Sequence, residues 1–277
     1  MNPKVSVIIP CYNEPEDVFR RSVESVTAQT LKDIEIIIVL DNPDNTELRE
    51  IIGDYQRVFD NILLLTPEKN LGRGNARNLA IGSAQWKYIA IHDADDIDMP
   101  RRLEEQFTHM EQNPQIWATF SAIQNMDEHW EVIPQTLTVP SVDAKSFFLK
   151  WLNHQTMFIR SQVLRSLGWY KDINFGEDVD LWMRMFIEDI KISGIETVHT
   201  HYLTPLESTH SDSIEKLKKW RITSLEFYRA YFKYLVKDPV FIRLFITNLL
   251  DYAALHMGRK NYVRYRNAIQ RLKQKND

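Results

Sequence analysis

The chain contains little cysteine, no long apolar run and no standard glycine signature for phosphate binding. Its single cysteine, Cys11, excludes an internal disulfide. No apolar run approaches the roughly 20 residues that a helix needs to span a bilayer, so we expect no transmembrane segment. Gly72 and Gly74 lie close together, but neither the dinucleotide fingerprint nor the P-loop spacing is present. The sequence therefore argues against a disulfide scaffold, a transmembrane protein and a P-loop enzyme.

We also expect no secretory leader, because an apolar strand pattern begins within the first ten residues. We therefore expect a cytoplasmic protein, with peripheral attachment to the inner face of the cell membrane as an open alternative. The chain is 44% apolar and 26% charged, which is typical of a folded soluble protein rather than a disordered one. Its 277 residues can bury one large core and carry a small appendage.

Charge is distributed unevenly along the chain. Residues 215–277 carry 15 lysines and arginines against 5 acids, a net charge of +10, whereas residues 1–214 carry −14. This asymmetry predicts an acidic body and a basic tail that attaches to something anionic. The basic helix expected at residues 261–273 either packs on the body as a cap or rests on anionic lipid. We expect no nucleic-acid partner.

Apolar runs alternate with helical patterns through the first hundred residues. This order predicts an α/β fold with right-handed crossovers and a mostly parallel, doubly wound sheet. The second half reads as a mixed sheet, and helical patterns follow from residue 213. The expected strands are residues 5–10, 34–40, 62–66 and 88–91 in the first half, then 116–123, 131–139 and 191–199.

An acid cluster directly follows the strand at residues 88–91. Four aspartates stand within six residues: Asp93, Asp95, Asp96 and Asp98. Ligands of open α/β sheets bind outside the carboxyl ends of the strands, and crowded carboxylates repel one another. A divalent cation that carries ligand phosphates would relieve this repulsion.

The alternative is a solvated acidic loop without a ligand. In either case Asp98 precedes a Met-Pro pair, and this pattern predicts that Asp98 caps the helix expected at residues 100–113.

Other polar residues near the strand ends would share the same rim. Asp41 could accept hydrogen bonds from a base or ribose, and Tyr12 offers a flat face for stacking; a turn-forming aspartate and a half-buried aromatic are the alternatives. Arg73 and Arg77 lie one helical turn apart and could meet phosphates, or both could be solvated.

A second acid cluster starts the amphipathic helix expected near residue 177. Helix capping explains one or two acids in a first turn, but Glu177, Asp178 and Asp180 are three acids in four residues. A carboxylate held here near an electrophile could act as a general base. Any of three late histidines could complete a metal shell, although a lone histidine is more often structural: His199, His201 and His210.

Taken together, these segments resemble family 2 glycosyltransferases, a large inverting family with the GT-A fold. The resemblance covers roughly residues 3–211 and rests on an ordered set of motifs. These are VSVIIPCYNE (5–14), IIIVLDN (36–42), NLGRGNARNLAI (70–81) with IAIHDADD (89–96), and GEDVDLW (176–182). The family's usual VDDGSTD stretch reads VLDNPDN at residues 39–45, without the first acid and the glycine.

The resemblance implies a donor site for a nucleotide sugar. Asp93 and Asp95 match the family's DXD motif, with Asp95 as the direct metal ligand and Asp93 nearer the ribose or a metal-bound water. His210 resembles a late histidine near the diphosphate and adds a candidate ligand. The implied cofactor is Mn²⁺ or Mg²⁺. The positions that match nucleotide-binding residues are Pro10, Tyr12, Glu14, Asp41, Arg77 and Asp93.

The resemblance also implies the reacting group. Asp178, in the pair with Glu177, matches the catalytic base, while His154 and Trp182 fall on the acceptor side. The base would deprotonate an acceptor hydroxyl in line with the breaking bond, and the cation would meet the charge of the leaving diphosphate. Inversion converts an α-linked donor into a β-linked product.

We therefore expect a metal-dependent inverting hexosyltransferase that uses a UDP-linked sugar. Its acceptor would be a saccharide or lipid-linked saccharide in O-antigen or capsule synthesis. A catalytic domain would cover residues 1–211, with a nucleotide-binding half (1–100) and an acceptor half (101–211), followed by a basic helical extension (212–277). One alternative is a sugar nucleotidyltransferase, although the glycine-rich, lysine-bearing loop it needs after the first strand is missing. The other is a nucleotide-sugar or saccharide-binding protein without turnover.

Overall fold

The computed structural model describes residues 4–137, 152–173 and 176–204, together with scattered helical residues between 222 and 253. The chain divides into two compact units, Met1–Thr204 and Pro205–Asp277. The domain boundary expected after residue 211 stays a prediction, and the basic helix expected at 261–273 lies outside the described residues. Among the helices of the described part, none is both long and apolar enough to cross a membrane.

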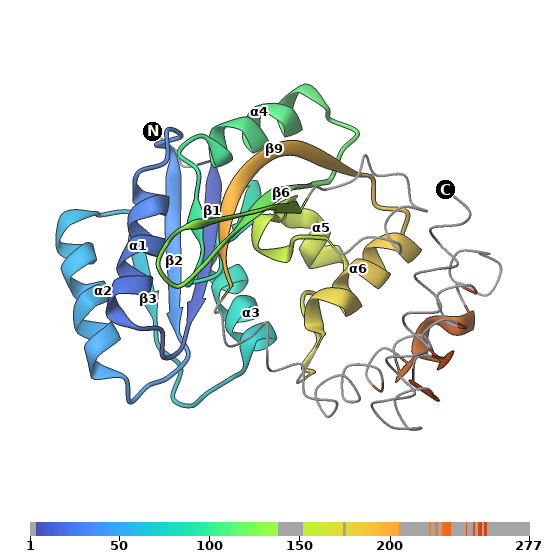
Figure 1. Cartoon of the computed structure of the whole chain (residues 1–277), viewed down its shortest axis with the longest axis horizontal. Helices are drawn as coiled ribbons and strands as arrows, with labels where there is room; N and C mark the ends of the chain where they lie inside the picture. Colours follow the sequence, from blue (N-terminus) through green and yellow to red (C-terminus); the bar gives the residue numbers. More distant parts are fainter. Residues whose placement is uncertain are drawn as a thin grey trace. The chain divides into compact units, whose positions relative to one another are not determined.

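The described strands of the first unit form one nine-stranded sheet in the order β3-β2-β1-β4-β8-β6-β9-β5, with β7 paired to β6 (Figure 1). Its first four strands pair in parallel, as the apolar runs predicted. The side chains of the three inner strands are almost entirely buried because helices cover both faces, whereas the edge strand β3 is only partly buried. These strands are β1 (Val5–Cys11), β2 (Ile34–Leu40), β3 (Ile62–Leu65) and β4 (Tyr88–Ile91).

The second half of the sheet is mixed, which confirms the expected fold class. The strand β8 (Phe158–Arg160) runs antiparallel to both β4 and β6 (Ala118–Met126), and so joins the two halves. The long strand β9 (Ile192–Leu203) pairs in parallel with β6 and curves across the sheet (Figure 1). The remaining strands are β5 (Ile97–Asp98), antiparallel to β9, and β7 (Val132–Leu137).

Two apolar cores lie on opposite faces of this sheet because successive strand side chains alternate. Val7 and Ile9 face one core, whereas Ile8 faces the other. Each fully buried aliphatic side chain contributes about 1.5–3 kcal/mol to folding. The first core is covered by α1 (Glu16–Thr27), α2 (Thr46–Val58) and α4 (Arg102–Gln112), and the second by α3 (Arg73–Ser83), α5 (Ser161–Ser166) and α6 (Glu177–Ile187).

The expected cap at Asp98 is wrong. The helix α4 begins after Arg101, which makes no side-chain capping bond, while Asp98 lies in the short strand β5 and is 3% exposed. Its carboxylate accepts hydrogen bonds from Arg102 Nη1 at 2.6 Å and from Thr200 Oγ1 at 2.8 Å. Asp98 therefore belongs to the interior of the protein rather than to a helix terminus.

Candidate active site

The aspartates after β4 sit on a short loop, the acid loop, which we define as residues 92–98. A backbone bond from Asp96 N to Asp93 O, 3.1 Å long, closes a turn at its centre. The carboxylate of Asp96 points inward and accepts a hydrogen bond from Leu203 N at 3.2 Å. Asp93 keeps 31% of its side chain exposed, so the accessible part of the loop is its DXD segment.

A buried arginine joins the acid loop to the second acid cluster. Arg77 Nη2 donates to Asp93 Oδ1 at 2.8 Å, and Arg77 Nη1 donates to Glu177 Oε1 at 3.0 Å. Arg77 is 4% exposed, so the alternative of a solvated arginine is wrong for this residue. One planar guanidinium therefore holds together two carboxylates from opposite halves of the first unit.

The loop before α3 is held by Asp41 at the end of β2. Its two carboxylate oxygens accept from Leu71 N at 2.7 Å and from Gly72 N at 2.9 Å. Gly72 precedes the helix at φ 79°, a left-handed conformation that favours glycine. Asp41 thus positions the helix that carries Arg77. Its expected contact with the nucleobase stays a prediction.

The helix α3 packs very closely against the segment that precedes α6. A Cβ atom on Gly74 would lie 3.3 Å from Lys171 O and 3.5 Å from Glu177 Cβ. Asn78 exchanges two hydrogen bonds with the backbone of Tyr170, one from Asn78 Nδ2 at 2.8 Å and one to Asn78 Oδ1 at 2.9 Å. This packing fixes the separation between Arg77 and Glu177.

The carboxylates of this site differ in their electrostatics. Burial would raise the pKa of Asp93, but the neighbouring Arg77 guanidinium outweighs it, so the pKa lies below its ordinary value. Burial and the charge of Asp93 raise the pKa of Asp95 to about 6. Burial and the adjacent Glu177 likewise raise the pKa of Asp178 to about 6. Raised pKa values are typical of functional carboxylates, and the roles expected of Asp95 and Asp178 stay predictions.

The two acceptor-side candidates lie close together. His154 begins the 3-10 turn η1 (His154–Thr156), and its ring centroid lies 6.3 Å from that of Trp182. His154 Nε2 contacts Tyr170 Oη at 2.8 Å. Burial and the positive charge of Arg77 lower the pKa of His154 to about 3, so its ring is neutral. Both candidates are mostly buried, so only an edge of each could meet an acceptor.

The remaining donor-side candidates lie at the carboxyl end of β1 and in the turn that follows it. Pro10 is half-buried within β1, and Tyr12, just past the strand, is 45% exposed. Tyr12 N donates to Glu14 Oε2 at 2.7 Å. Burial raises the pKa of Glu14. Tyr12 therefore has a free ring face, whereas Glu14 turns back to hold the loop.

Some candidate residues have structural partners instead. Asp180 pairs with Arg184 at 2.8 Å and Lys171 at 3.1 Å, so the third acid of its cluster stabilises α6. His199 Nε2 lies 2.9 Å from Glu105 Oε2, which places it against α4 rather than among the aspartates. His210 lies outside the described residues.

Sequence reasoning missed two residues that shape the site. Tyr170 contacts His154 and lies under Arg77, 5.8 Å from the ring centroid to the guanidinium carbon, yet no motif marks it. Arg102 was also missed, although its spacing from Asp98 is the i,i+4 pattern of an ion pair.

Two carboxylates of the acid loop could hold a divalent cation. Among the residues that the structure describes, no group of three or more His, Cys, Asp or Glu is arranged to hold an ion. However, magnesium and manganese commonly need only one or two carboxylates, because phosphate oxygens and waters complete the shell. Asp93 and Asp95 supply oxygen ligands, and the raised pKa of Asp95 reflects negative charge that a cation would relieve. The residues therefore fit such an ion.

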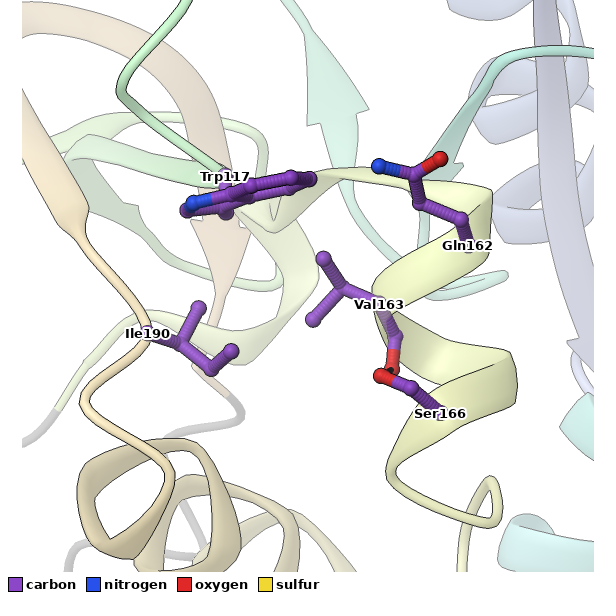
Figure 2. A pocket seen from close by; sticks show the side chains of 5 residues that line it. All are labelled: Trp117, Gln162, Val163, Ser166 and Ile190. Atoms are coloured by element: carbon purple, nitrogen blue, oxygen red, sulfur yellow. Dashed lines mark hydrogen bonds between the residues drawn. The ribbon is translucent and has the colours of Figure 1, made fainter.

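A separate apolar pocket of about 290 Å³ lies beside α5. Figure 2 shows Val163 and Ile190 facing each other near the ring of Trp117; Gln162 and Ser166 complete the lining. Trp117 O accepts from Arg160 N, and Arg160 pairs with Tyr88, the first residue of β4. The aspartates follow the other end of β4, so this pocket is not part of the site.

Comparisons with known proteins identify the family of this chain. The sequence model for "Glycosyl transferase family 2" matches residues 6–173. The chain is 36% identical over 255 residues to an uncharacterized glycosyltransferase of Methanocaldococcus jannaschii, covering 90% of this chain and 88% of that protein. It is 28% identical to the amylovoran biosynthesis glycosyltransferase AmsE of Erwinia amylovora, covering 86% and 88%.

Solved structures show the same fold. A crystal structure of S. aureus TarS 1-349 in complex with UDP-GlcNAc matches with a TM-score of 0.65 at 20% identity, covering 88% of this chain and 72% of that one. In another TarS structure the match spans 39% of the longer chain. The sheet is therefore of the expected GT-A type. With the family match and the relatives in agreement, this chain belongs to glycosyl transferase family 2 and is a transferase enzyme.

Proposed function

We propose that this enzyme transfers a hexose from a UDP-linked sugar, with inversion, to a saccharide or lipid-linked saccharide in the synthesis of a surface polysaccharide. The proposal is carried by one observation, the double contact of Arg77 with Asp93 and Glu177. This contact joins the acid loop, through one guanidinium, to the first residue of α6, whose second residue is the proposed base, Asp178. A donor held at the loop would therefore present its sugar to that base.

The donor nucleotide would bind along the ends of β1 and β2. The exposed ring of Tyr12 offers a stacking face, and Asp41 keeps lone pairs that could accept from a base. Pro10 and Glu14 shape the same loop. The UDP-GlcNAc in the TarS structure supports a UDP-linked donor.

A divalent cation would be held by Asp95 and Asp93. Enzymes of this family and fold generally use such an ion, and when bound it supplies positive charge that stabilises the departing diphosphate. Because Arg77 already engages Asp93, Asp95 is the carboxylate left to bind directly. The proposed contribution of His210 stays a prediction, since that residue lies outside the described part of the chain.

Asp178 would act as the general base. With a pKa of about 6 it is mostly ionised at neutral pH, yet basic enough to accept a proton from an acceptor hydroxyl. The hydroxyl oxygen forms a bond to the anomeric carbon as the bond from that carbon to the phosphate oxygen breaks, and the electron pair leaves with the diphosphate. Glu177 is tied to Arg77, so its role is to orient rather than to accept the proton.

A lipid-linked acceptor is favoured by a further relative. An Escherichia coli protein, 25% identical over 204 residues (71% of this chain and 72% of that protein), is named UDP-Gal:alpha-D-GlcNAc-diphosphoundecaprenol beta-1,3-galactosyltransferase. We propose that His154 and Trp182 contact the acceptor sugar through their exposed edges.

Such an acceptor would require contact with a membrane surface. In the second unit, Ile246, Leu249 and Leu250 are helical, about half exposed and spaced three and four residues apart, as on one face of a helix. Together with the net charge of +10 in residues 215–277, they support attachment to anionic lipid.

Leu249→Glu should reduce sedimentation with anionic vesicles at least fivefold, whereas Val58→Glu in the first unit should not. Equal sedimentation of both variants would contradict this attachment.

A transfer assay tests the function itself. UDP-galactose and UDP-GlcNAc are supplied with a short-chain lipid diphosphate of α-GlcNAc, with and without Mn²⁺. We expect metal-stimulated release of UDP and a β-linked product, identified by its NMR coupling constant. Formation of nucleotide sugar from a sugar 1-phosphate would instead indicate a nucleotidyltransferase. Binding of both nucleotide sugars without turnover would indicate a binding protein.

A further inference from the structure

A continuous chain of buried polar side chains runs behind the candidate active site. Each member is fully or almost fully buried, and none is a residue of the proposed reaction. We call these residues the polar chain: Ser22, His92, Asp98, Arg102, Gln106 and Thr156.

The first residues of the polar chain bring the two ends of the acid loop together. Ser22 Oγ on α1 lies 2.7 Å from His92 Nε2, and His92 Nδ1 lies 3.0 Å from Asp98 Oδ2. His92 and Asp98 are the two ends of the loop that carries Asp93 and Asp95. The DXD segment is therefore clamped from behind at both of its ends.

Arg102 continues the chain along α4. Its Nη1 donates to Asp98 Oδ2 at 2.6 Å, and its Nη2 donates to the carbonyl of Ile91, the last residue of β4, at 2.6 Å. Its Nε donates to Gln106 Oε1 at 3.2 Å. Because all three nitrogens are engaged, this buried charge is compensated on every side.

Gln106 carries the chain to the other side of the site. Its Nε2 donates to Thr156 O at 2.8 Å. Thr156 ends the turn η1, whose first residue is His154, and its hydroxyl accepts from Ser121 N at 2.9 Å. One amide side chain therefore connects the arginine that braces the donor loop with the turn that carries a proposed acceptor contact.

Burial of polar groups is unfavourable unless every group finds a partner, and an apolar interior would have stabilised α4 equally well. We propose that Gln106 is a positioning residue that sets the turn at residues 154–156 relative to the acid loop, and so aligns acceptor with donor. This inference rests on the proposed transferase reaction for its kinetic consequence, but not for its structural one.

The test compares Gln106→Met with Gln29→Met in the full-length protein. Gln29 is almost equally buried and also bonds to α4, through Leu103 N, but its side-chain hydrogen bonds go to Ser25, Met99 and Leu103 and not to residues 153–156. Hydrogen exchange of peptides covering residues 153–160 should accelerate at least tenfold in Gln106→Met and stay within twofold of wild type in Gln29→Met. Equal exchange of this segment in all three proteins would overturn the inference.

Kinetics with UDP-galactose and a lipid diphosphate of α-GlcNAc supply a second readout. Gln106→Met should raise the acceptor KM about tenfold and lower kcat several-fold, while donor affinity and donor hydrolysis by water stay within twofold. A parallel loss of donor binding would show a merely structural role and would also overturn the inference. If wild type transfers no sugar at all, the proposed function fails, whereas the exchange experiment still decides whether Gln106 holds the turn.

Discussion

Two buried arginines reach the acid loop from opposite faces of the sheet, and they differ in what they leave accessible. Arg102, from α4, encloses Asp98, whose side chain is 0% exposed and whose pKa falls to about 2, because the charges of Arg102 and His92 outweigh the effect of burial. Arg77, from α3, binds one oxygen of Asp93 and leaves 31% of that side chain exposed. One arginine thus completes the interior, and the other contacts a carboxylate that stays partly exposed.

The comparison predicts which acids are structural and which are reactive. Asp98 and Asp180 have cationic partners within 3.1 Å, whereas Asp95 and Asp178 share a pKa of about 6 that burial and a neighbouring acid raise. A carboxylate without a cationic partner is costly to keep ionised, and such sites are where catalytic groups are found. Substitution of a reactive acid should therefore lower activity and keep stability, whereas substitution of a structural acid should lower stability and keep activity.

The largest effect is expected at Asp178. Asp178→Asn should lower kcat about a thousandfold, since general bases contribute roughly 10²–10⁴ in rate, while the affinity for UDP-galactose stays near that of wild type. The matched control is Asp180→Asn on the same helix, which should lower the melting temperature but keep kcat within about threefold. A steady-state assay with a thermal melt checks both. Unchanged turnover in Asp178→Asn would remove it as the base.

Asp95 should show the next largest effect. Asp95→Asn should abolish the stimulation by Mn²⁺ and lower kcat/KM for the donor about a hundredfold, because the proposed direct ligand is lost. Its melting temperature should equal or exceed that of wild type, since removing this charge relieves repulsion with Asp93. A Mn²⁺ titration followed by isothermal calorimetry measures this. A normal response in the variant would place the ion elsewhere.

Substitution of Asp98 should lower stability and leave the response to Mn²⁺ intact. Asp98→Asn leaves Arg102 buried without its counter-charge, a change that costs about 3–5 kcal/mol in comparable buried pairs. The melting temperature should fall by roughly 6–12 °C, while the folded protein keeps its response to Mn²⁺. A variant that is as stable as wild type would contradict the division between structural and reactive acids.

The smallest expected effect concerns the pH dependence of kcat. The pKa of Asp178 is raised to about 6, and a base must be deprotonated, so kcat should fall about tenfold per unit as pH drops below 6. Asp178→Asn should lack this limb in its residual activity, whereas Asp180→Asn should keep it. If kcat of the wild-type enzyme instead falls only around pH 4, the pKa of Asp178 is not raised.

Most of the first half of the fold could be predicted from the sequence. The runs that became β1, β2 and β4 are continuous apolar segments between turn residues, and their alternation with helices determines a parallel sheet. The strands β5 and β8 were missed because two and three residues are too few to show a period. Their positions depend on pairing with β9 and β4, which no local pattern encodes.

The site was predictable in its residue types but not in its contacts. The acid clusters stand out as excess charge, yet the partners of Arg77 and Asp98 lie up to about a hundred residues away along the chain, as in the bond from Thr200 to Asp98. Asp98 also showed how a local pattern misleads. An aspartate before a proline is typical of a helix cap, but tertiary partners outweighed that preference.

Gly74 sets the spacing between α3 and the start of α6, because its side chain is a single hydrogen atom. A methyl group there would require the Lys171 carbonyl to retreat by a few tenths of an ångström, and the displacement would pass along the chain to Glu177 and its neighbour. In-line displacement tolerates little misalignment, and an error of about 1 Å can cost a hundredfold in rate. The smallest residue type in the chain thus sets the spacing on which the proposed alignment of donor and acceptor depends.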